Sequence, residues 1–567
     1  MPALAAGASA LLSWNRWIRP FVDGSRELQV PARVAAGERL YRDVAYYYGP
    51  AAPWVNGAAV AVFGRRFAVL ELAGAAAAAL LFLALFRLTR RAGSALSAGV
   101  AVTIAAAICV GAPNGGAFLF PYAFAALFAS AGALAALAAF AGPVSVRGAT
   151  AGAAALAFAL LAKAEIGAAA AAVVGIAALR GAEAGERRRT WGAVAAAVVA
   201  AAAGYAFAFR GMALSSLASE GPLVLLSPPA EWRQVYRAIS GLDDPTGAAT
   251  RIATALFLDA AVLGAAWLAS RGTSDATSKP RAAEAAWWIL LAAAVALCAT
   301  ETGGRIEDQL PTMLSPAPLA AAAAAAALLF RRGRLDETGR ARWLLFGFAA
   351  LASVRVAGNV AYAYVTTPYA VLALPALAAS AAVLVLDVLA PRLASRAAFR
   401  RAAAAALLAL AAAGLVRLDR IRRARPLVPL ETAAGTLRLP EPWQRASAAT
   451  LGFLAGRARP GDGLACLPEC GVFNFVTGLP NPLRQEQILP GHLDAAAEAA
   501  VAERIRSSGP RFLIVVDSPP PGWAAARFGR DYARAISAAI AEGYALAAAA
   551  RSPEGASLLR VFERRGR

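Results

Sequence analysis

Long apolar stretches separated by short polar loops make up the chain as far as about residue 417. Many of these Ala-, Leu- and Val-rich stretches approach the roughly 20 residues that an α-helix needs to cross a bilayer. The pattern predicts about thirteen transmembrane helices. The predicted segments are 3–20, 67–88, 93–112, 117–140, 148–162, 166–181, 190–209, 250–270, 285–300, 311–330, 343–360, 368–390 and 402–417. Segment 3–20 is the weakest, because it is short and contains Asn15 and Arg16.

Basic residues alternate between dense and sparse loops along this region. Every second loop is rich in arginine, for example 87–91, 180–189 and 331–342, and the loops between them are poorer or carry acids. Short cytoplasmic loops hold the Lys and Arg excess of membrane proteins. The alternation therefore places the N-terminus in the cytoplasm and residues 418–567 outside it. One run, 417–425, disagrees, because its arginines follow the last span on the expected outer side.

The last part of the chain has a different pattern. Short apolar runs at 463–467, 512–516 and 558–562 predict buried strands, and residues 494–507 and 531–540 predict helices. The expected fold is thus an α-helical polytopic membrane body, residues 1–417, followed by an extracytoplasmic α/β domain, residues 418–567. A long outer loop, residues 21–66, follows the first helix.

Composition supports the membrane assignment and excludes other classes. The chain is 59% hydrophobic with mean hydropathy +0.55, more apolar than a soluble protein of 567 residues would be. Its net charge of +21 lies mostly in loop arginines, so we expect no nucleic-acid partner. The single histidine, His492, argues against a His-based metal site or a Ser/His/Asp triad.

The Arg-rich, Lys-poor composition favours a bacterial inner-membrane protein. Cys466 and Cys470 lie close enough in sequence for a disulfide to be one option in an oxidising compartment.

Polar residues kept near the membrane surface are the candidates for chemistry. Asp23 stands where the chain leaves the first span, and a carboxylate there can act as a general base. The competing interpretation is an exposed helix cap before a solvated amphipathic helix. The tyrosines of 46–48 fit an interfacial aromatic belt equally well.

Cations on the outer side are candidates for binding a phosphate. Lys163, followed by Glu165, is one of two lysines in an arginine-rich chain, and its ammonium can neutralise a departing lipid phosphate. A self-contained Lys–Glu pair explains it as well. Arg305 and Arg355 are candidate phosphate clamps, although ordinary loop or membrane-surface arginines fit both positions.

Several of these stretches together resemble the GT-C glycosyltransferase superfamily, near the protein mannosyltransferases and the lipid A aminoarabinose transferase. The similar parts are Asp23, residues 33–40, Tyr46-Tyr47-Tyr48-Gly49-Pro50-Ala51-Ala52-Pro53, Phe63-Gly64, Phe120-Pro121-Tyr122, residues 161–167, Leu467-Pro468-Glu469, residues 474–478 and Asn481-Pro482. The resemblance implies a membrane glycosyltransferase that moves a sugar from a polyprenyl-phosphate donor to a lipid, glycan or protein acceptor outside the cytoplasm, with inversion. Membrane lipids would surround it.

The same resemblance assigns roles to individual residues. Asp23 would take the acceptor proton. The substrate-binding candidates are Glu27, Tyr48, Lys163, Glu165, Arg305 and Arg355. Many relatives carry an Asp-Glu pair where this chain has Asp23-Gly24, and a lysine of the first loop is missing. A divalent cation is a candidate cofactor, with Asp23, Glu27 and Asp43 available as ligands, but nothing in the sequence fixes their geometry. Two other classes stay open: a transporter or flippase, and a non-catalytic scaffold of the same fold.

Overall fold

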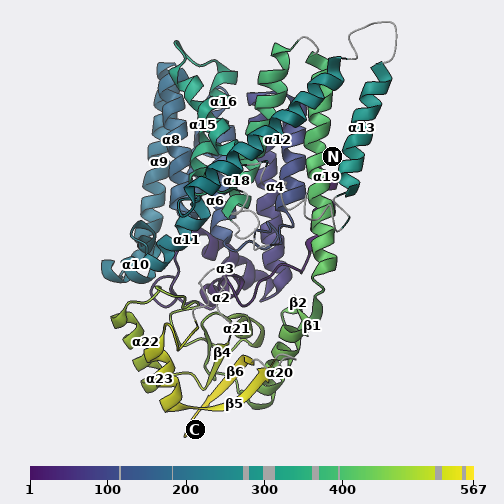
Figure 1. The fold of residues 1–567 in the computed structure, drawn as a ribbon. Helices are drawn as coiled ribbons and strands as arrows, with labels where there is room; N and C mark the ends of the chain where they lie inside the picture. The colour runs from purple at the N-terminus through teal and green to yellow at the C-terminus, as the bar shows by residue number, and fades with distance from the viewer. Residues whose placement is uncertain are drawn as a thin grey trace.

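The computed structural model describes residues 1–113, 116–181, 183–271, 280–297, 300, 313, 315–360, 369–393, 396–517, 527–551 and 557–566. A bundle of long helices forms one part of the molecule, and a smaller α/β part lies against one end of it (Figure 1). The C-terminus lies at the far side of the α/β part. The separation into a helical body and a C-terminal α/β domain thus follows the hydropathy of the chain.

A helix occurs at each of the thirteen predicted apolar segments. They are α1 (Pro2–Ser13), α4 (Phe67–Ala92), α5 (Ala95–Cys109), α6 (Phe124–Phe140), α7 (Val146–Ala162), α8 (Ala164–Gly181), α9 (Ala184–Phe209), α12 (Pro245–Arg271), α13 (Pro280–Leu297), α15 (Ala317–Phe330), α16 (Glu337–Ser353), α18 (Tyr369–Val383) and α19 (Arg396–Ala424). Among the described residues, six helical stretches are long and apolar enough to cross a membrane. The protein is therefore a multi-pass membrane protein, and the number of spans stays a prediction.

Small residues let these helices pack closely. Gly74 of α4 faces the backbone of Phe118 and Leu119, where an added Cβ would lie 2.2 Å from the Leu119 carbonyl oxygen. Gly132 of α6 similarly meets the backbone of α7 at Ala155. Because lipid tails are as apolar as the helix surfaces, close backbone approach of this kind favours helix association in membranes. The alanine-rich composition therefore suits a tightly packed bundle.

The first outer loop folds into two helices, of which the first is buried. Helix α2 (Gly24–Ala35) buries every residue from Gly24 to Arg33, including the charged Arg26, Glu27 and Arg33. Helix α3 (Ala51–Phe63) follows it. The alternative of a solvent-exposed amphipathic helix after Asp23 is wrong, because α2 lies between the helical body and the α/β part (Figure 1). Three short helices follow α9 in the chain, namely α10 (Leu214–Glu220), η1 (Pro222–Leu226) and α11 (Ala230–Ser240). Helices α10 and α11 lie toward the same end of the bundle as α2 (Figure 1).

The C-terminal part contains a four-stranded mixed sheet in the order β3-β4-β6-β5. Strands β3 (Leu464–Leu467) and β4 (Phe512–Val516) are parallel, and β6 (Ser557–Arg564) pairs antiparallel with β4 and with β5 (Tyr544–Arg551). The helices of this part are α20 (Glu441–Arg457), α21 (Val472–Thr477), α22 (Ala495–Ser508) and α23 (Arg534–Gly543). A separate hairpin, β1 (Val428–Thr432) and β2 (Gly435–Leu439), connects α19 to this part. The sequence predicted β3, β4, β6, α22 and α23, and it missed β1, β2, β5, α20 and α21.

Candidate active site

Asp23 lies directly before α2 with its side chain 30% exposed. The carboxylate makes no cap hydrogen bond to the helix that it precedes. Gly24 follows it because the turn leaves no space for a side chain: an added Cβ would lie 2.6 Å from the Arg19 carbonyl oxygen. This geometry explains the departure from the acidic pair of the relatives, since a second acid cannot occupy position 24 without moving the backbone.

Arg26 is the centre of the polar network around Asp23. Its buried guanidinium donates to Asp23 Oδ1 at 3.1 Å, to Glu27 Oε1 at 3.1 Å and to the Tyr122 carbonyl oxygen at 2.8 Å. Hydrogen bonds from one planar guanidinium to several fixed acceptors hold both partners in place. We therefore assign Arg26 the positioning of the Asp23 carboxylate, a role that the sequence did not reveal.

Glu27 lies behind Arg26 and does not face solvent, since it is 2% exposed. Its second carboxylate oxygen accepts the backbone N–H of Phe124 at 3.0 Å. Burial raises the pKa of Glu27 to about 6, although Arg26 opposes the shift. In the structure, one oxygen of Glu27 accepts from Arg26 within α2, and the other joins α2 to the start of α6. That Glu27 contacts a substrate stays a prediction.

The C-terminal part contributes two side chains to the same network. Gln487 accepts from Arg26 Nη1 at 2.9 Å, and its amide nitrogen donates to Asp23 Oδ1 at 3.4 Å and to Glu469 Oε2 at 2.9 Å. Glu469 is 3% exposed, and burial, together with the charge of Asp23, raises its pKa to about 8. A second carboxyl group thus stands close to Asp23, supplied from a position more than 400 residues along the chain.

Tyr48 connects this network to Lys163. The Lys163 ammonium lies 4.4 Å from the centroid of the Tyr48 ring, and the guanidinium carbon of Arg26 lies 5.3 Å from the same centroid. Gly49 makes this contact close: its N–H donates to the Ala162 carbonyl oxygen at 3.2 Å, and a Cβ there would lie 2.0 Å from the Leu161 carbonyl oxygen. Tyr48 is therefore part of the network around Asp23, and both cations contact its ring.

Lys163 occupies the turn between α7 and α8 and is buried, with its side chain 6% exposed. Its ammonium pairs with Glu165 at 3.2 Å. Burial, followed by the nearby positive charges of Arg355 and Arg26, lowers the pKa of Lys163 below its usual value. Arg355 itself stacks over the Tyr236 ring at 4.8 Å. Thus Lys163, Glu165 and Arg355 form one cluster on the far side of Tyr48. Arg305 lies outside the described residues.

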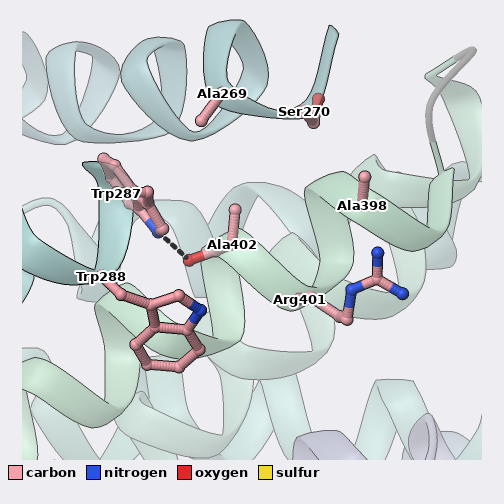
Figure 2. Close-up of a pocket in the computed structure, with 7 residues that line it drawn as sticks. All are labelled: Ala269, Ser270, Trp287, Trp288, Ala398, Arg401 and Ala402. Carbon is pink, nitrogen blue, oxygen red and sulfur yellow. Dashed lines mark hydrogen bonds between the residues drawn. The ribbon is translucent and has the colours of Figure 1, made fainter. Parts of the chain in front are cut away.

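A shallow pocket of about 210 Å³ adjoins Asp23. It is lined by Trp17, Arg19, Val22, Asp23, Gly24, Phe120, Pro121 and Tyr122. Lys163 is not part of this lining. Another pocket, of about 310 Å³, lies between α12, α13 and α19, where Trp287 Nε1 donates to the Ala402 carbonyl oxygen at 3.0 Å (Figure 2). None of the candidate residues lines that second pocket.

The structure does not bring the three carboxylates considered for a cation into one site. Asp43 pairs with Arg42 at 2.8 Å and caps the N–H of Arg39, whereas Asp23 and Glu27 both contact Arg26. Over the described residues, no group of three His, Cys, Asp or Glu side chains is arranged to hold a metal ion. The sulfur atoms of Cys466 and Cys470 are buried and free.

The helical body, the buried helix α2 and the C-terminal α/β part form a fold similar to that of solved GT-C glycosyltransferases. ArnT from Cupriavidus metallidurans in the apo state superposes with TM-score 0.51 at 13% sequence identity, covering 99% of this chain and 97% of ArnT. The oligosaccharyltransferase of Archaeoglobus fulgidus in complex with Zn and sulfate gives TM-score 0.48 at 14% identity, covering 98% of this chain and 72% of that one. The arabinofuranosyltransferase AftD from Mycobacteria gives TM-score 0.44 at 16% identity, covering 100% and 40%.

No family model and no curated protein matches the sequence. The similarity to ArnT therefore rests on the arrangement of the helices, and it confirms the fold implied by the sequence motifs. At this level of identity it establishes the fold alone.

Proposed function

We propose that this protein is a membrane glycosyltransferase that moves a sugar from a polyprenyl-phosphate donor to an acceptor outside the cytoplasm. The observation that carries the proposal is the shared contact of Tyr48. Its ring joins the Arg26–Asp23 pair on one side to the Lys163 ammonium on the other. A carboxylate base and a phosphate-binding cation are the two groups that this reaction needs close together.

The reaction follows from the charges of these two groups. An acceptor hydroxyl or amine attacks the anomeric carbon of the sugar, and its proton passes to the Asp23 carboxylate. The bond between that carbon and the phosphate oxygen breaks, and the lipid phosphate leaves with the electron pair. Lys163, assisted by Arg355, stabilises the negative charge of the leaving phosphate. Attack from the face opposite the leaving group inverts the anomeric configuration.

The donor class has support from the fold comparison. ArnT from Cupriavidus metallidurans has also been solved bound to undecaprenyl phosphate. A lipid phosphate suits a chain whose candidate cations lie at the ends of apolar helices, where a lipid headgroup lies. A lipid, a glycan or a protein would serve as acceptor. We place the enzyme in a bacterial inner membrane, with the N-terminus cytoplasmic and residues 418–567 outside.

Replacement of the base tests the proposal. Asp23→Asn keeps the size of the side chain and one acceptor for Arg26, so we expect normal folding and a loss of at least about 100-fold in transfer of labelled sugar from a polyprenyl-phosphate donor. Asp517→Asn, which changes an exposed carboxylate paired with Arg560, is the matched control and should keep full activity.

Three other outcomes would contradict the proposed function. Full activity of Asp23→Asn removes Asp23 from the mechanism. Solute flux through proteoliposomes that contain no lipid-linked donor would instead identify the protein as a transporter. Absence of both activities in the unaltered protein would leave the non-catalytic scaffold.

A further inference from the structure

A groove separate from the Asp23 site opens where three parts of the chain meet. These are the connection between α1 and α2, the start of α4 and the turn of the β1–β2 hairpin. The groove has about 650 Å³ of empty volume, part of it open to solvent. Its lining is Trp14, Asn15, Arg66, Phe67, Ala68, Glu71 and residues 432–436. The N–H of Phe67 donates to the Ala434 carbonyl oxygen at 3.0 Å, which holds the hairpin turn against α4 as one wall.

Glu71 is an unusual residue for this position. It lies one turn into the long apolar helix α4 and is only 2% exposed. One carboxylate oxygen accepts the Asn15 backbone N–H at 2.6 Å. Within the described part of the chain, the buried amide oxygen of Asn15 has no hydrogen-bond partner. A buried acceptor without a donor costs free energy, and a carboxylate kept in an apolar helix is a candidate for function. The groove therefore favours a ligand that carries hydrogen-bond donors, and a cationic donor most of all.

Arginines gather beside the same groove. Arg66 lines it, and Arg16 follows Asn15 in the chain. Partial burial, and then the positive charges of Arg438 and Arg422, lower the pKa of Arg16, and Arg422 itself pairs with Asp419 at 2.7 Å. Arg422 belongs to the arginine run that contradicted the charge alternation of the loops. Like charges brought together in this way favour an anion such as a phosphate group.

We propose that the groove binds the headgroup of an ethanolamine phospholipid from the surrounding membrane. Its ammonium group would donate to Glu71 and to the Asn15 amide oxygen, and its phosphate would lie against Arg66 and Arg16. A primary ammonium carries three N–H donors, which a trimethylammonium lacks. The groove lies at the ends of α1 and α4 nearest the C-terminal part, beside the half-exposed Trp14, and tryptophan at such a position is typical of the headgroup level.

The bound lipid would contact both parts of the molecule. Glu71 and Arg66 belong to the helical body, whereas residues 432–436 belong to the hairpin that leads into the C-terminal part. Binding would therefore stabilise the contact between the hairpin and α4. This role is independent of sugar transfer, so it stands or falls separately from the function proposed for Asp23.

Lipid titration of the full-length, delipidated protein in detergent, read by native mass spectrometry, tests the site. We expect phosphatidylethanolamine to bind more tightly than phosphatidylcholine or phosphatidylglycerol of equal chain length. Glu71→Gln should weaken phosphatidylethanolamine binding by roughly tenfold or more, because a charge-assisted hydrogen bond is lost. Its carbonyl oxygen still accepts the Asn15 N–H, so the fold is expected to persist. Glu441→Gln, at an exposed carboxylate of α20, is the control and should bind as the unaltered protein does.

Two results would overturn the proposal. Equal binding of the three lipids would show that no ammonium is recognised, and unchanged phosphatidylethanolamine binding by Glu71→Gln would remove the carboxylate. If Glu71→Gln does not fold, Ala68→Trp fills the groove from an exposed helix position and should abolish binding. Retained binding in that variant would place the lipid elsewhere.

Discussion

Three side chains control the charge around Asp23, and each comes from a different environment. Arg26 supplies a fixed positive charge, Gln487 a neutral bridge, and Glu469 a carboxyl group that burial keeps protonated near neutral pH. A protonated Glu469 adds no negative charge beside the Asp23 carboxylate.

Glu469 gives a testable dependence of stability on pH. Its pKa in the folded protein, about 8, lies above the value of an exposed glutamate, so the folded state binds this proton more tightly. The contribution of Glu469 to the free energy of unfolding is complete below the pKa that this group has in the unfolded chain. It is lost as the pH rises from about 4.5 toward 8. We expect the melting temperature of the unaltered protein to fall over that range more than that of Glu469→Gln. The difference corresponds to a few kcal/mol at most. Parallel pH curves of the two proteins would contradict the assignment.

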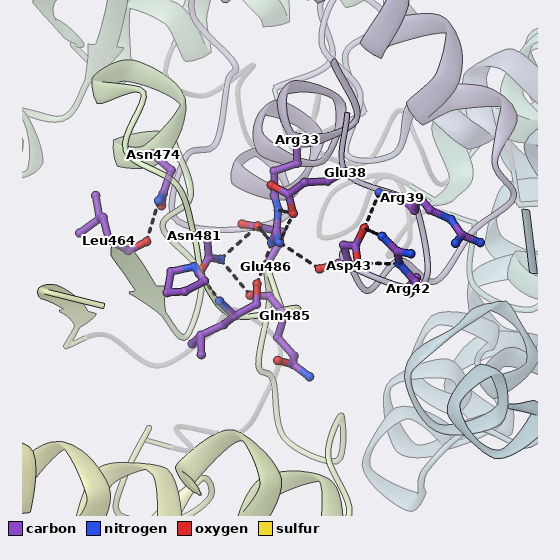
Figure 3. Close-up of polar contacts among 12 residues, drawn as sticks. Arg33, Glu38, Arg39, Arg42, Asp43, Leu464, Asn474, Asn481, Gln485 and Glu486 are labelled. Atoms are coloured by element: carbon purple, nitrogen blue, oxygen red, sulfur yellow. Dashed lines mark hydrogen bonds and ion pairs between the residues drawn. The ribbon is translucent and has the colours of Figure 1, made fainter. Parts of the chain in front are cut away.

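The segment from Leu483 to His492 attaches the C-terminal part to the first outer loop. Arg33 of α2 donates to Glu486 Oε1 at 2.5 Å (Figure 3). It also donates to the Leu483 carbonyl oxygen at 2.8 Å. At the other end, the His492 ring bonds the Tyr47 hydroxyl at 3.0 Å, and burial lowers the pKa of His492 to about 3, so it is neutral. This segment carries Gln487 into the site, and its two anchors decide where Gln487 lies.

Breaking the first anchor should destabilise the docking of this segment. Arg33→Ala leaves the carboxylate of Glu486 buried without its cation, which costs roughly 3–5 kcal/mol. Thermal unfolding in detergent should show a clear decrease in melting temperature. The double variant Arg33→Met with Glu486→Leu should recover most of it, because no buried charge remains unpaired.

A surface pair provides the comparison for this experiment. Arg445→Ala removes an exposed partner of Glu441, where the loss should stay below about 1 kcal/mol. An equal effect of Arg33→Ala and Arg445→Ala would mean that the Arg33–Glu486 pair does not hold the segment in place.

At the scale of the whole molecule, the α/β part and the buried helix α2 lie at the same end of the bundle (Figure 1). The Asp23 site and the Glu71 groove both lie where these two parts meet. If sugar transfer occurs outside the cytoplasm, this entire end must face outward. The charge alternation of the loops predicts the same orientation.

Accessibility labelling can determine this orientation. Cys109, Cys466 and Cys470 are buried, so they should react slowly, and Cys298→Ser removes the fourth cysteine. A cysteine introduced at the exposed Arg445 should react with a membrane-impermeant maleimide in intact cells. A cysteine at Gly185, an exposed position in the first turn of α9, should react only after permeabilisation. The reverse pattern would invert the topology and contradict transfer on the outer side.

The sequence alone determined the features that depend on local pattern. Apolar length predicted the position of each long helix, because the hydrocarbon thickness of a bilayer sets how many apolar residues must follow one another. Asp23 and Lys163 were identifiable because charged residues near a membrane boundary are costly unless they have a use. Short continuous apolar runs also predicted β3 and β4, which are buried on both faces.

Only the tertiary structure decided which polar groups meet. Gln487 and Asp23 are 464 positions apart, and no local pattern marks Gln487, Glu469 or Arg26 as partners of Asp23. In the sequence, Glu71 is a single acid in an apolar helix. Only the structure shows that the hairpin turn at Ala434 forms a groove beside it. The physical reason is that burying a charge or an amide is tolerated only with a partner, and the partner can come from any segment that the fold brings near. The sequence shows that burying such a residue costs free energy, and the tertiary structure shows which partner compensates that cost.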